Sequence, residues 1–403
     1  MNINKWTIAL AAAGVVSFAS VSNAQEAKET VKTLAASTTL SGYVSTSVNW
    51  TPGTQNEFSR YRSFNSGKTD RFALDVISLT LASKAGEGEW AAGYKATIWA
   101  GPDANSLGTG TSQSNVDDTS SSDDLTVGSR DFAIKNAYIS LRAPLGSGVD
   151  LKLGVFDTII GYESTDRNVN PFYSHSWGFA VEPTQHTGLL ASYRLSDAIS
   201  VSVGIANTTD AVINAQADNN SRKTYMAAAT LTAPDSFGFL KGASVTAGWV
   251  GGRDSALGAT SDQNIYVGAT IPTPIKGLTL GAAWDRKSYS GTVDDLLGVP
   301  ELELDGTGEL DLDVFAAYLS YSLTDKLTVG YRGEVVVYDA VIDGDGADGT
   351  VAWGHTLGLD YKLWANVTSR IEYRIDDSNL AKAADVTTRK LSQSVTLNVI
   401  YNF

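Results

Sequence analysis

The sequence predicts an all-β fold, a transmembrane antiparallel up-and-down β-barrel of about 16 strands. Three observations predict it. Apolar side chains recur at every second position along segments of strand length, which is the side-chain period of a β-strand with one apolar face. Short turns alternate with long polar loops along the chain. The last alternating segment ends on the aromatic Phe403, as expected for a barrel whose aromatic side chains lie at the membrane interface.

The segment from Leu391 to Phe403 shows the alternation most clearly. One face carries apolar side chains apart from Gln393, and the other carries polar ones apart from Ile400. We take the apolar face as the lipid-facing one, which assigns the lumen face of every other strand by the same alternation.

The first 24 residues have the features of a secretory signal peptide. Lys5 supplies a positive charge, Trp6 to Phe18 form an apolar run, and Ser22-Asn23-Ala24 resembles a cleavage site. Residues 25–38 are expected to form a short polar periplasmic lead. The barrel is expected to occupy residues 39–403, in the outer membrane of a Gram-negative bacterium.

Composition excludes several classes of protein. Beyond the signal peptide no run of 18 apolar residues occurs, which excludes a membrane protein built from helices. The chain has no cysteine, so it has neither disulfides nor thiolate metal sites. Its formal net charge of −14 argues against nucleic acid as a partner.

Sixteen strand-like segments follow one another, joined by seven short turns and eight longer loops. Fourteen or 18 strands remain possible, because the first two segments alternate less cleanly. A barrel of this size leaves an aqueous channel, whereas eight strands would be filled by side chains. A soluble all-β protein is the alternative, and the unequal loop lengths count against it. The predicted strands are 39–50, 71–83, 90–100, 130–143, 149–157, 186–195, 198–207, 223–232, 243–252, 263–271, 278–287, 311–323, 327–338, 351–363, 366–376 and 391–403.

The predicted lumen face carries nine basic and six acidic residues, so the wall is expected to be mixed and slightly basic. Charged lumen residues tune selectivity in such barrels. A wall whose charges merely keep the lumen wet is the alternative for any single residue. The candidate pore-lining residues on strands are Lys152, Arg194, Arg332, Glu334, Arg370, Glu372 and Arg374. The candidate interface aromatics are Trp90, Trp284, Tyr401 and Phe403.

Residues 158–185, called the long loop below, interrupt the alternation for 28 residues. Such a length is unusual for an idle connection, and the segment carries five aromatic side chains that a solvated loop would not need. We expect the loop to fold into the barrel and narrow it, with Glu163, Asp166 and Glu182 facing the basic wall. An outward lid or an oligomer contact is the alternative.

The long loop and the strands after it also carry a family resemblance. The residues are GYES at 161–164, NPFYSHSWGF at 170–179, and EPTQHTGLLASYRLSD at 182–197, with SVSVGIANTTD at 200–210. This stretch resembles the putative beta-barrel porin-2 (OmpL-like) family of outer-membrane proteins. The resemblance implies a pore for small solutes and fixes no substrate.

The expected function is therefore an outer-membrane porin, a passive diffusion channel for ions and small hydrophilic solutes. A surface adhesin or a structural anchor without an open pore is the alternative. A hydrolase is disfavoured, because His175, His186 and His355 have no serine and carboxylate at suggestive spacing. No cofactor or metal is implied. The expected partners are outer-membrane lipid and lipopolysaccharide, the barrel assembly machinery, small polar solutes and, in a homotrimer, copies of the chain. Anion or cation preference stays open.

Overall fold

The computed structural model describes residues 38–52, 68, 70–86, 88, 90–107, 109, 131–217, 222–253, 261–292, 307–342, 345–378 and 390–403. The predicted signal peptide and nearly all of the predicted periplasmic lead lie outside this part of the chain. The barrel belongs to a compact unit that extends from Leu40 to Phe403.

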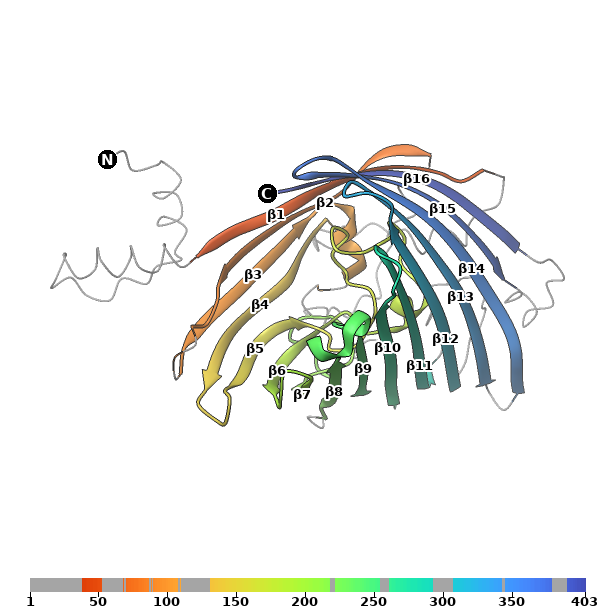
Figure 1. The fold of residues 1–403 in the computed structure, drawn as a ribbon. Helices are drawn as coiled ribbons and strands as arrows, with labels where there is room; N and C mark the ends of the chain where they lie inside the picture. Colours follow the sequence, from red (N-terminus) through yellow and green to blue (C-terminus); the bar gives the residue numbers. More distant parts are fainter. Residues whose placement is uncertain are drawn as a thin grey trace. The chain divides into compact units, whose positions relative to one another are not determined.

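Sixteen antiparallel strands close into one barrel, in which each strand pairs with its neighbours in sequence and β16 pairs with β1 (Figure 1). The closing pair aligns Val48 with Leu397. These findings confirm the predicted fold class and strand number. The strands are β1 (Thr39–Trp50), β2 (Arg71–Ser83), β3 (Ala92–Ala100), β4 (Phe132–Ala143), β5 (Val149–Asp157), β6 (Gln185–Arg194), β7 (Ile199–Ala206), β8 (Thr224–Thr232), β9 (Ser244–Gly252), β10 (Ser261–Pro272), β11 (Leu278–Thr292), β12 (Thr307–Ser322), β13 (Leu327–Ile342), β14 (Asp345–Trp364), β15 (Val367–Ser378) and β16 (Lys390–Asn402).

The two faces of the wall have opposite chemistry. On β15, Ile371 and Tyr373 are exposed. Arg370, Glu372 and Arg374, which alternate with them, are each at most 3% exposed. A soluble protein buries its apolar side chains and exposes its charges. The reversed pattern is that of a membrane barrel with a polar interior.

Four strands extend by at least four residues beyond a predicted end. β11 to β14 reach 15, 16, 16 and 20 residues, and β14 begins at Asp345 where the alternation predicted Val351. The segment DGADGT before Val351 has no apolar alternation, yet its backbone continues the ladder to Ile342 of β13 beyond a register shift at Tyr338. Backbone pairing does not depend on side-chain pattern, so sequence periodicity underestimates such extensions.

At two places on the strands, consecutive side chains are both buried, which breaks the alternation. On β2, Asp75 and Val76 are both buried, between the exposed Leu74 and Leu79. This break explains why the segment 71–83 alternates less cleanly. On β4 a register shift against β3 likewise buries two consecutive residues, Lys135 and Asn136. A bulge places one extra residue on a face and so redirects a side chain.

Short helices complete the described part of the barrel unit. The 3-10 helix η2 (Pro102–Leu107) follows β3 and contacts β2 and β4, and a second one, η3 (Asp235–Leu240), lies between β8 and β9. The five-residue helix α4 (Trp177–Val181) lies in the long loop against β11 and β12, capped by the Ser176 hydroxyl. None of the helices in the described ranges is long and apolar enough to cross a membrane.

Candidate functional site: the long loop and the inner wall

The long loop connects β5 to β6 and lies among the inward faces of the strands (Figure 1). Its last residue, Gln185, already pairs with Asp157 as the first residue of β6, so the loop ends one position earlier than predicted. The loop contacts two regions of the wall that lie on either side of β16, one formed by β12 to β15 and the other by β1 to β4 with η2.

Glu163 and Arg332 form the centre of the first region. Arg332 Nη1 lies 2.9 Å from Glu163 Oε1, and Arg332 Nε lies 2.9 Å from Glu334 Oε2 on the same strand. The hydroxyl of Tyr318 donates to Glu163 at 3.0 Å, and the backbone N–H of Trp177 donates to Glu334. Tyr318 belongs to β12, and Arg332 and Glu334 belong to β13. The Glu163 carboxylate of the loop therefore joins these two strands.

The loop backbone around Ser174 is held by β15. The backbone N–H groups of Tyr173 and Ser174 donate to Glu372 at 2.7 and 3.1 Å. Arg374 donates to the hydroxyl of Ser174 at 2.9 Å and to the carbonyl of His175 at 2.6 Å. Charged partners make such hydrogen bonds stronger than neutral ones, so the loop is fastened through its main chain as well as its side chains.

The second region fastens the loop to the wall on the other side of β16. Arg167 forms an ion pair with Asp103 of η2, and its guanidinium lies 4.2 Å from the Tyr173 ring centre. Asp166 lies 3.1 Å from Nζ of Lys135 on β4. The Tyr173 hydroxyl lies 3.0 Å from Asp75 of β2. Arg167, Tyr173, Lys135, Asp75 and Asp103 are at most 1% exposed, so these contacts are shielded from water.

Two loop carboxyls have opposite electrostatic environments. Burial alone would raise the pKa of Glu163, but the Arg332 guanidinium and the His175 ring hold that pKa at about 2, so Glu163 is ionised. Burial, together with the neighbouring carboxyl group of Asp285, raises the pKa of Glu182 well above its ordinary value. Glu163 therefore acts as an anion in an ion pair, whereas the surroundings of Glu182 favour the protonated form of its carboxyl group.

The structure brings together most of the predicted pore-lining residues. Glu163, Asp166, Arg332, Glu334, Glu372 and Arg374 all take part in loop contacts, as does Arg370 through the carbonyl of Asn170 at 2.7 Å.

Three predicted residues lie away from this cluster. Glu182 was expected to face the basic wall, but it lies beside the carboxyl group of Asp285 instead. Lys152 points inward on β5, with its Nζ 5.2 Å from the ring centre of Tyr138. Arg194 ends β6 at the turn side and is exposed, with its carbonyl bonded to Ser147.

Other charged residues were missed by the sequence prediction. Lys68, Asp75, Asp103, Lys135 and Arg167 lie on loops, on η2 or at the two irregular strand positions. The alternation of apolar and polar residues, on which the prediction relied, does not identify residues at such positions. A charge inside an otherwise apolar strand, such as Lys135 in FAIKNAYI, was the one signal that could have indicated the β4 bulge.

The predicted slight excess of basic residues on the inner wall is wrong for its buried part. The additional acids come from irregular positions and strand ends, which strict alternation does not count. Among the described strand residues, the buried charged side chains are seven acids, Asp75, Asp262, Asp285, Glu334, Glu372, Asp376 and Asp377, and four bases, Lys135, Arg332, Arg370 and Arg374.

The candidate interface aromatics lie on the outside. Trp90, Tyr401 and Phe403 are 64%, 48% and 45% exposed. Trp284 is half-buried on the outer face of β11, and its ring N–H donates to Asp313 at 2.9 Å. Trp90 lies in the turn before β3, two residues before the strand begins.

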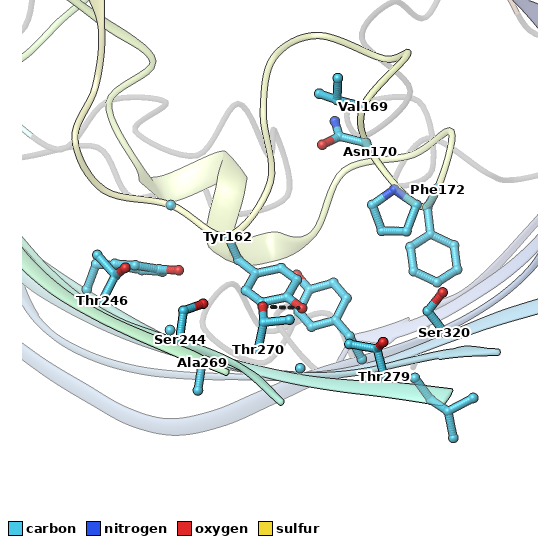
Figure 2. A pocket seen from close by; sticks show the side chains of 17 residues that line it. Tyr162, Val169, Asn170, Phe172, Ser244, Thr246, Ala269, Thr270, Thr279 and Ser320 are labelled. Atoms are coloured by element: carbon cyan, nitrogen blue, oxygen red, sulfur yellow. Dashed lines mark hydrogen bonds between the residues drawn. The ribbon is translucent and has the colours of Figure 1, made fainter. Parts of the chain in front are cut away.

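Two cavities lie beside the loop, towards the short turns. The first has a volume of about 350 Å³ and is lined by aromatic rings and hydroxyl groups (Figure 2). In it Tyr162 stacks on Tyr318 at 4.1 Å between ring centres, and Thr270 donates to the Tyr162 hydroxyl. The second has a volume of about 320 Å³ and is lined by charged and amide side chains. Among the described residues no cluster of three His, Cys, Asp or Glu could hold a metal.

The three histidines have different surroundings and do not contact one another through the hydrogen bonds of their rings. His175 contacts Glu163 at 3.1 Å inside the loop, and His186 contacts the hydroxyl of Thr158 at 3.2 Å. His355 lies on the outer face, 2.6 Å from the hydroxyl of Tyr331. The hydrogen bonds of each ring thus join it to a different part of the barrel.

Comparison with known proteins agrees with this architecture. The family model described as "Putative beta-barrel porin-2, OmpL-like" matches residues 37–403. The chain belongs to this family. The match covers the whole barrel and confirms the resemblance found in the sequence. No protein with a curated description matches the chain significantly.

Solved structures show the same fold at low sequence identity. The outer membrane channel DcaP of Acinetobacter baumannii is 12% identical, with a TM-score of 0.57, over 91% of this chain and 97% of its own. The anion-selective porin from Comamonas acidovorans is 12% identical, with a TM-score of 0.56, over 91% and 99%. Vibrio cholerae OmpT in a trimer form is 13% identical, with a TM-score of 0.57, over 91% and 99%.

Proposed function

We propose that this member of the porin-2 family is an outer-membrane porin, a passive diffusion channel whose constriction is formed by the long loop and the charged inner wall. The observation that carries the proposal is the Glu163–Arg332 ion pair, which joins the loop to the inward face of β13 at 2.9 Å. Family membership and a barrel of sixteen strands support a water-filled interior.

The geometry suggests how the constriction selects solutes. Carboxylates and guanidinium groups from the loop and from β13 and β15 lie side by side, so closely spaced charges of both signs produce strong local fields at this level. Such a field orders water, which favours polar solutes and disfavours apolar ones.

Planar-bilayer recording tests the proposal. The purified protein is expected to give discrete conductance steps, and deletion of Asp166–Phe179 is expected to enlarge them, because it removes the loop segment held by both walls. Steps of unchanged size after the deletion would refute the constriction. The reversal potential in a salt gradient would then assign anion or cation preference.

An anchor or adhesin without an open pore is the second candidate. The observation that favours it is the attachment of the loop to both walls, through Arg332 on one side and Asp103 on the other. Absence of conductance steps from correctly folded protein would support it. Under either function we propose contact with lipid and lipopolysaccharide, insertion by the barrel assembly machinery, and a homotrimer, as in the trimer form of Vibrio cholerae OmpT.

A further inference from the structure

The second cavity, called the cation-lined cavity below, lies between the tip of the long loop and the strands β12 to β16. It is lined by Lys326, Lys362 and Arg370, by one acid, Asp360, and by amide side chains that include Asn168 and Asn170. Three cations face one carboxylate, so the walls of this cavity carry net positive charge. Lys326 lies in the turn between β12 and β13, which places the cavity at the short-turn end of the barrel.

The positive charge of this cavity is compensated only in part, unlike that of the loop attachment. Arg332 and Arg374 are held by carboxylates at 2.9 and 2.7 Å. Arg370 holds Asp360 through Nε and Nη2, at 2.7 and 2.9 Å, and its Nη1 has no hydrogen-bond partner among the described atoms. Within the described ranges Lys326 and Lys362 form no ion pair. Asp360 thus neutralises Arg370, and the two lysines remain to attract an anion.

The aromatic and hydroxyl-lined cavity adjoins this one. The two share the loop residues 169–171 and Ser320, so they are direct neighbours. Besides Tyr162 and Tyr318, the first cavity offers the hydroxyls of Thr246 and Thr270, and none of its lining residues is charged (Figure 2). Its chemistry matches a carbon chain that carries hydroxyl groups on one side and C–H groups that pack on an aromatic ring on the other.

We propose that these two cavities form one binding site for a small hydroxylated organic anion, such as a sugar acid. The carboxylate lies at Lys326 and Lys362, and the hydroxylated carbons lie along Tyr162 and the threonines. The inference rests on the proposed function, since it names the class of solute that the channel would carry. It assigns solute recognition to the short-turn side of the loop, separate from the ion pairs that hold the loop in place.

The test uses glucuronate as the probe, with glucose and acetate as its uncharged and unhydroxylated counterparts. Titration calorimetry on the detergent-solubilised protein measures binding without requiring an open channel. Glucuronate is expected to bind more tightly than either counterpart. The variant K326Q/K362Q is expected to bind it roughly two- to thirtyfold more weakly, because two partly exposed charge contacts are lost. The control K241Q removes a lysine paired with Asp235 in the β8–β9 turn and should leave the affinity unchanged.

The inference is overturned if glucuronate does not bind, if glucose or acetate binds equally well, or if K326Q/K362Q binds as the unaltered protein does. Bilayer recording with the same probes separates the two proposals. Binding without conductance steps would refute the channel and leave the binding site standing. Steps without glucuronate binding would refute the site and leave the channel standing.

Discussion

Replacing Arg332 with methionine is expected to release the long loop from β13. Arg332 is fully buried and donates six hydrogen bonds, three of them to Glu163 and to the carbonyl and hydroxyl of Ser174. Methionine removes the cation and leaves the Glu163 carboxylate buried beside no guanidinium. Removing one partner of a buried ion pair costs about 3–5 kcal/mol. That cost falls on the attached state of the loop, because a released Glu163 regains water.

The magnitude can be measured with a single thiol. The chain has no cysteine, and Thr165 in the loop is only 5% exposed, so a Thr165→Cys background reacts with maleimide chiefly when the loop opens. At 1.4 kcal/mol per factor of ten, Arg332→Met should raise the labelling rate by roughly 150- to 4000-fold. Circular dichroism of the same samples checks that the barrel has formed.

Two further variants make the measurement decisive. Arg142→Met breaks an ion pair with Asp150 at the short-turn end, away from the loop, and should leave the labelling rate within about threefold. Arg332→Lys keeps the charge but loses the fork of donors, and should give an intermediate rate. A rise of less than about tenfold for Arg332→Met, or one no larger than that for Arg142→Met, would show that Arg332 does not hold the loop.

Three other perturbations follow from the same geometry. Burial and the Asp285 carboxyl raise the pKa of Glu182 above 4.5, so the attached loop retains a proton that the released loop loses. Attachment should therefore weaken as pH rises from about 4.5 towards the raised pKa of Glu182. Glu182→Gln should abolish that dependence when the labelling rate is divided by the rate of an exposed thiol at the same pH, and an unchanged slope of this ratio would contradict the reasoning. Tyr173→Phe removes a hydroxyl bond to a β2 carboxylate and should speed labelling about fivefold, for a loss of about 1 kcal/mol. Gly281→Ala places a Cβ 1.9 Å from the Tyr162 hydroxyl and should destabilise the protein by about 1–3 kcal/mol in denaturant titration, whereas Gly88→Ala, with open space around it, should not.

Sequence reasoning reached the barrel because a membrane wall imposes a simple rule. One face of every strand contacts lipid and the other faces the polar interior, so apolar residues such as Ile371 alternate with polar ones such as Arg370. That rule gave the fold class, the number of strands and the inward orientation of Arg332, Glu334, Glu372 and Arg374. It needed no knowledge of which strands meet across the lumen.

The partners of those residues depended on the tertiary structure. Glu163 and Arg332 are 169 positions apart, and Tyr173 reaches Asp75 from a position 98 residues away. No local period records such distances, and the bulge that turns Lys135 inward breaks the period that was used. The sequence by itself thus determined the barrel and the polarity of its two faces. Only closure of the barrel around the loop decided which charges neutralise one another, and it left Lys326 and Lys362 at the short-turn end without an ion pair to any described residue.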